Sequence, residues 1–130
     1  MRKKPELLAP AGGYEALVAA VQSGADAVYM GFGAFNARRS ARNFSDEEFR
    51  AAVSYCHLRG VKVYLTLNTL VTDRDLPALA AEARTASECG VDAILVQDWG
   101  VLSTLQKIIP DVPLHASTQM SLHTLSGVKE

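Results

Sequence analysis

CGVDAILV, residues 89–96, places a glycine directly before a short apolar run. The glycine closes an amphipathic stretch, as a left-handed residue at a helix C-terminus does. The run that follows is apolar at nearly every position instead of alternating with polar residues. Strands that are buried on both faces have this composition, which is typical of parallel sheets. The segment therefore predicts a helix end followed by a buried parallel strand.

The same pattern occurs twice earlier in the chain, as SGADAVYM at residues 23–30 and RGVKVYL at residues 59–65. A weaker version without the glycine, PDVPLH, occupies residues 110–115, and a first strand is expected at residues 6–9. Between the strands we predict four helices: residues 13–23, a second beginning at a capping box of Ser45 and Glu48, a third beginning near Asp73 or Asp75, and residues 100–109. This alternation predicts a right-handed parallel α/β fold.

Two architectures share that alternation, an open doubly wound sheet and a (β/α)₈ barrel. A nucleotide-binding open sheet would have a glycine-rich turn that opens a helix, and APAGG (9–13) and GFGAFN (31–36) match that motif poorly. A complete barrel needs about 250 residues. We therefore expect an α/β fold that is the N-terminal half of a TIM-barrel-like domain. Residues 1–130 would form a single partial domain, truncated at its C-terminus.

Composition narrows the classes of function. The chain has 130 residues, 48% of them hydrophobic, and a formal charge of −1, so overall charge favours neither nucleic acid nor an acidic membrane surface. It contains no apolar run of the length that a membrane span requires. Cys56 and Cys89 fall in predicted helices and form no metal-ligand pair. We expect a cytoplasmic protein with reduced thiols, no metal site in this chain and no membrane partner.

Polar side chains follow three successive predicted strands, where binding sites form in both architectures. We expect them to line a substrate pocket, and they are Asn68, Gln97, Asp98, His115, Ser117 and Gln119. Asn68 and Asp98 have an alternative role as caps of loops or helices. His115 is interpreted as a general base, a metal ligand or a buried histidine bonded to the backbone.

A second candidate site lies in the loop at residues 31–44, which contains Arg38, Arg39 and Arg42. Three guanidinium groups beside glycines suit a phosphate or carboxylate, so this loop is a candidate anion site. The alternative is an ordinary solvated loop. Tyr29 and Tyr64 lie inside predicted strands, where core packing is expected.

The common catalytic signatures do not occur. The sequence contains neither HExxH nor GxSxG, and both cysteines lie on helices away from the strand ends. Asp98 is the one acidic residue placed at the strand ends, so paired carboxylates are not expected there. These motifs leave the catalytic residues unassigned.

Six segments follow one another in the order and spacing of a known family: ELLAPAGGYEAL (6–17), GADAVYMG (24–31), FNAR (35–38), VYLTLNTL (63–70), VQDWGV (96–101) and LHASTQMS (114–121). They resemble the collagenase-like peptidases of unassigned catalytic type, peptidase family U32. The resemblance covers nearly the whole chain and implies a TIM-barrel-like N-terminal domain. It implies that the chain is the N-terminal barrel fragment of a collagenase-like peptidase.

The resemblance also implies two alternatives: a hydroxylase of an RNA base in tRNA or rRNA, or of a small molecule, and a non-catalytic binding fragment. Several family members carry an iron–sulfur cluster on cysteines in a later part of the chain. Cys56 and Cys89 do not match those positions, so we expect no cofactor in this chain and a cluster in the full-length protein. The full-length protein is expected to be an enzyme with an RNA or protein substrate. The fragment alone is expected to be inactive and to self-associate through exposed barrel edges.

Overall fold

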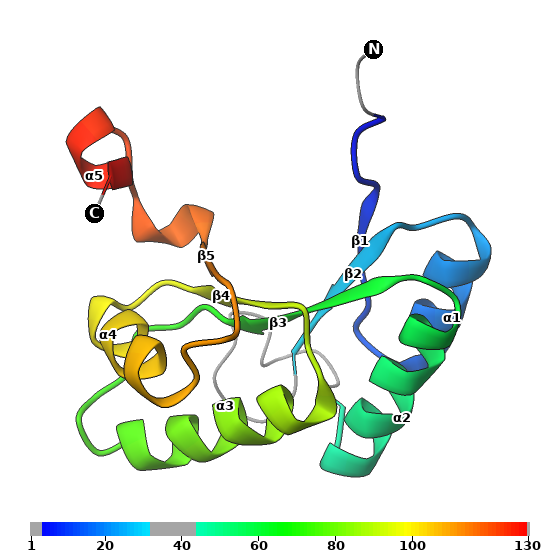
Figure 1. The fold of residues 1–130 in the computed structure, drawn as a ribbon, viewed down its shortest axis with the longest axis horizontal. Helices are drawn as coiled ribbons and strands as arrows, with labels where there is room; N and C mark the ends of the chain where they lie inside the picture. Colours follow the sequence, from blue (N-terminus) through cyan, green and yellow to red (C-terminus); the bar gives the residue numbers. More distant parts are fainter. Residues whose placement is uncertain (1–3, 32–43, 130) are drawn as a thin grey trace.

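The computed structural model describes residues 4–31 and 44–129, in which strands and helices alternate (Figure 1). In chain order the elements are β1 (Leu8–Pro10), α1 (Tyr14–Gln22), β2 (Ala27–Met30), α2 (Asp46–Leu58), β3 (Lys62–Leu67), α3 (Leu76–Cys89), β4 (Ala93–Val96), α4 (Trp99–Ile108), β5 (Leu114–Ala116), the 3₁₀ helix η1 (Thr118–Met120) and α5 (Leu125–Lys129).

The strands of the described residues form one parallel sheet in the order β1-β2-β3-β4-β5. A doubly wound sheet reverses its strand order at a switch point, whereas a barrel adds each strand beside the previous one. Figure 1 shows helices α1 to α4 on one side of this sheet. The prediction of a parallel α/β fold that is the N-terminal half of a TIM-barrel-like domain is therefore confirmed.

The predicted element boundaries are largely confirmed. Gly24, Gly60 and Gly90 have φ angles of 100°, 72° and 87°, the left-handed conformation expected where a helix ends before a strand. Ser45 accepts a hydrogen bond from the Glu48 amide at 3.2 Å, and the Glu48 carboxylate accepts one from the Ser45 amide at 3.4 Å, which completes the capping box. The first strand begins two residues later than expected, at Leu8.

Apolar side chains lie on both faces of the sheet, in two clusters of different size. The larger core lies between the sheet and the helices, and it joins strand residues such as Val28, Leu65 and Ile94 to helix residues such as Phe49 and Leu105. A smaller apolar cluster occupies the opposite face, which we call the inner face: Ala27, Tyr29, Tyr64, Ala93 and Leu95. Because side chains alternate between the faces of a strand, apolar groups on both faces account for the continuous apolar runs in the sequence.

Aspartates tie neighbouring strands together where the strands begin. Asp26 accepts a hydrogen bond from the Leu7 amide at 2.7 Å. Asp92 accepts one from the Val63 amide at 2.7 Å and lies 2.9 Å from His57 Nε2. These two aspartates occupy the same place in two of the repeated segments, so they are structural and leave the opposite ends of the strands for binding.

Candidate functional site

Three of the six predicted pocket residues meet where β4 and β5 end. The Gln97 side-chain amide donates to the Gln119 carbonyl oxygen at 3.1 Å. Ser117 is buried, its amide donates to the Val96 carbonyl at 2.8 Å, and its hydroxyl accepts from the Gln119 amide at 3.3 Å. This small polar cluster joins the end of β4 to the first turn after β5. Its role in substrate binding stays a prediction.

The carboxylate of Asp98 is directed toward backbone amides. One oxygen accepts from the amides of Gly100 and Val101 at 2.7 and 3.2 Å, and the other accepts from the amide of Val71 at 3.2 Å. Asp98 thus caps α4 and fixes the loop between β3 and α3. Asn68 lies half-buried directly after β3. The predicted residues are therefore placed at the strand ends, but Asp98 is engaged in holding the backbone.

His115 lies on the inner face, where its ring makes an edge contact with Tyr64 at a centroid distance of 5.4 Å and an interplanar angle of 67°. The residue is exposed. Within the described residues its ring nitrogens have no hydrogen-bond partner, so the interpretation as a buried histidine bonded to the backbone does not hold.

Tyr64 is buried beneath His115, and its hydroxyl donates to the Glu6 carboxylate at 2.8 Å. Burial, together with the hydrogen bond and charge of Glu6, raises the pKa of the Tyr64 hydroxyl to about 12. The phenol therefore stays protonated at neutral pH and acts as a donor. Sequence reasoning assigned Tyr64 to the core and missed Glu6, which precedes the first strand. The sequence signal for Glu6 was the alternation of side chains along the strand. Glu6 is two residues before Leu8 and therefore lies on the same face of the sheet.

The remaining candidate residues are the three arginines of the loop and the two cysteines. Arg38, Arg39 and Arg42 lie outside the described residues. Burial raises the pKa of the Cys56 thiol to about 11 and also raises that of Cys89, so both thiols are protonated at neutral pH.

Across residues 4–31 and 44–129, no group of three or more His, Cys, Asp or Glu side chains is placed to hold a metal ion, and the cysteines do not fit an iron–sulfur cluster. No helix in those same ranges is long and apolar enough to cross a membrane.

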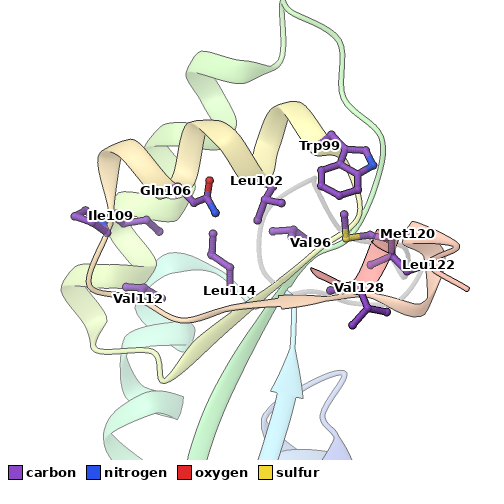
Figure 2. Close-up of a pocket in the computed structure, with 13 residues that line it drawn as sticks. Val96, Trp99, Leu102, Gln106, Ile109, Val112, Leu114, Met120, Leu122 and Val128 are labelled. Carbon is purple, nitrogen blue, oxygen red and sulfur yellow. The ribbon is translucent and has the colours of Figure 1, made fainter. Parts of the chain in front are cut away.

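A separate pocket of about 380 Å³, lined mostly by apolar side chains, lies on the other side of β5, between α4 and the C-terminal segment. Figure 2 shows Leu102 and Gln106 of α4 facing Leu114 of β5, with Trp99 and Met120 at one end. Because side chains alternate along β5, Leu114 points into this pocket while His115 points to the inner face. Gln97, Ser117 and Gln119 are not among the residues that line this pocket, so the pocket and the polar cluster are distinct.

Comparison with known proteins gives a family match and several similar proteins. The model of peptidase family U32 matches residues 12–130. The chain is 37% identical, over 98% of its length, to the tRNA hydroxylation protein P1 of Bacillus subtilis (strain 168). It is 35% identical, over 95% of its length, to the collagenase of Porphyromonas gingivalis (strain ATCC BAA-308 / W83). It spans 30% of the length of each of these two relatives. A solved structure of the U32 peptidase Mk0906 superposes with a TM-score of 0.70 at 15% identity, covering 98% of this chain and 55% of the other.

Proposed function

Because this chain belongs to peptidase family U32, we propose that the complete protein hydroxylates an RNA base and that these residues form one wall of its substrate pocket. The wall is the inner face together with the ends of β3, β4 and β5. The observation that carries the proposal is the chemistry of that wall, where the Gln97 side-chain amide meets the Gln119 carbonyl oxygen and the His115 imidazole has no hydrogen-bond partner among the described residues. Side-chain amides are among the groups that hydrogen-bond to base edges, and an imidazole offers the same kinds of donor and acceptor.

The hydroxyls of Ser117 and Thr66 and the thiol of Cys56 lack the arrangement that nucleophilic cleavage of a peptide requires. The Ser117 hydroxyl accepts a backbone hydrogen bond, and the Thr66 hydroxyl donates to the Met30 carbonyl at 3.3 Å. Neither is paired with a histidine or carboxylate that would remove its proton, as nucleophilic catalysis requires. The raised pKa of Cys56 makes its thiol a poor nucleophile as well. The similarity to a tRNA hydroxylation protein supports the same conclusion.

The test is the nucleoside composition of RNA from a strain that lacks the gene. Total tRNA and rRNA would be digested and analysed by mass spectrometry beside RNA from the parent strain. We expect one nucleoside to lose an oxygen atom in the deletion strain and to regain it when the wild-type gene is restored. Identical nucleoside profiles in the two strains would refute the proposal.

A peptidase is the second candidate, favoured by the similarity to a collagenase at nearly the same identity. Gelatin zymography of the purified complete protein distinguishes the two. Cleavage of gelatin together with an unchanged nucleoside profile would establish the peptidase in place of the hydroxylase.

Four further proposals concern this chain and the complete protein. Residues 1–130 form a single partial barrel domain, and an iron–sulfur cluster, if the complete protein has one, is held by cysteines other than Cys56 and Cys89. A tRNA or rRNA substrate places the protein in the cytoplasm. The chain alone self-associates, because β1 and β5 form the two edges of the sheet and Leu7 and Leu8 are exposed beside one of them.

A further inference from the structure

Tyr64 contacts groups that come from both ends of the sheet. It lies on β3, the middle strand, yet its hydroxyl reaches Glu6, just before β1, and its ring touches His115 on β5. One side chain spans this distance because the inner face curls toward itself, as the interior of a barrel does. Glu6, Tyr64 and His115 therefore form one connected unit, which we call the Tyr64 cluster.

The neighbours of Tyr64 explain how its ring reaches β5. Ala93 is its partner on β4 and lies between Tyr64 and the fifth strand. Its methyl group is buried against the tyrosine, and a larger side chain would fill the space that the ring crosses. The hydrogen bonds to Glu6, at 2.8 and 3.1 Å to its two oxygens, fix the other end of the phenol. The ring is thus held from both sides.

His115 differs from the other two histidines in what its ring nitrogens bind. His57 Nε2 lies 2.9 Å from the Asp92 carboxylate, and His123 Nδ1 lies 2.9 Å from the Ser121 carbonyl oxygen. The imidazole of His115 has only the edge contact with Tyr64 among the described residues. The contact with the Tyr64 ring, and not a hydrogen bond, holds this imidazole in place. Its two nitrogens are therefore available to a ligand.

We propose that His115 hydrogen-bonds the nucleobase of the substrate and that Tyr64 is the positioning residue that orients its imidazole. This inference rests on the proposed function and names the group that reads the base. A neutral imidazole offers one donor and one acceptor, which is the combination that base edges present. His115 also lies close in sequence to the polar cluster, since Ser117 follows it by two residues, directly after β5.

The experiment uses the complete protein, with unfractionated tRNA as the probe. Filter binding would measure the dissociation constant for the wild type, H115A, H115Q, Y64F and Y64L, with H57Q as the matched control on the helix side of the sheet. We expect H115A to weaken binding about tenfold, as loss of a hydrogen bond does, and H115Q to weaken it less. Y64F keeps the ring and should bind nearly as wild type, whereas Y64L should approach H115A. H57Q should leave affinity unchanged.

A spectroscopic readout separates orientation from folding. In protein labelled at histidine, the imidazole resonances assigned through H115A should shift when tRNA is added. They should also shift in Y64L without tRNA, because the ring contact is gone, and move less in Y64F.

The outcomes distinguish the two claims. Wild-type protein that binds tRNA, with unchanged His115 resonances and unchanged affinity of H115A, overturns this inference and leaves the proposed function standing. Failure of the wild type to bind tRNA, together with identical tRNA and rRNA nucleoside profiles in the deletion and parent strains, refutes the proposed function. The inference is refuted with it, because the imidazole then has no base to read.

Discussion

Replacing Asp98 with alanine tests whether this residue acts on the backbone or on the substrate. Its carboxylate accepts hydrogen bonds from the amides of Gly100, Val101 and Val71. Loss of a helix N-cap costs about 1–2 kcal/mol. Loss of the bond to the half-buried Val71 amide costs about 1 kcal/mol more. The expected destabilisation is therefore about 2–3 kcal/mol, which corresponds to a melting temperature lowered by roughly 6–15 °C in a domain of this size.

Two variants serve as controls in the same thermal melts. D98N keeps an oxygen acceptor and a good capping residue, so we expect it to lose no more than about 1 kcal/mol. S45A removes the matched cap of α2, for which the described residues show no tie to a second loop, and should cost about 1 kcal/mol. The order of stability should be wild type, then D98N and S45A, then D98A. If D98A melts with the wild type, the reasoning is refuted. If D98N is stable but binds tRNA weakly, the carboxylate contacts the substrate as well.

Three further predictions follow from the sequence and the structure. Replacing Arg38, Arg39 and Arg42 together by alanine should weaken RNA binding. It should also lower the slope of log affinity against log salt concentration by about two, because each phosphate contact releases counterions. Unchanged affinity in the complete protein would contradict the prediction of an anion site. Cys56 is buried with a pKa of about 11, so an iodoacetamide assay at pH 8 should label the half-buried Cys89 first, and equal labelling of the two native thiols would contradict this. Light scattering of the isolated chain at low micromolar concentration should detect oligomers, and a stable monomer would show that the exposed sheet edges do not associate.

The fold was predictable because it depends on short local patterns. Gly90 and the apolar run after it indicate a helix end and a buried strand without knowledge of any distant residue. The capping box at Ser45 likewise requires only residues that are close in sequence. The strand order was less certain, because the alternation of elements fits both a barrel and a doubly wound sheet. The observed order settles this, since each strand pairs with the next one in the chain.

The candidate site was only partly predictable because its contacts join residues far apart in sequence. The sequence placed Gln97, Ser117 and Gln119 at strand ends, and the structure brings them into contact. The link between Glu6 and Tyr64 spans 58 residues, and no local pattern reports it. Periodicity places both residues on one face, but the hydrogen bond depends on the curvature of the sheet.

The contrast between Asp98 and His115 separates two kinds of polar residue at the end of a strand. A charged group beside a helix start finds backbone amides within reach, and Asp98 is engaged by three of them. The imidazole of His115 lies on the inner face of β5 and bonds to no backbone amide of the described residues. Polarity alone therefore identifies the rim of the barrel but not the binding groups within it. The residues that remain available to a substrate are those that the strands place on the inner face. We therefore expect the substrate to contact His115 and not Asp98.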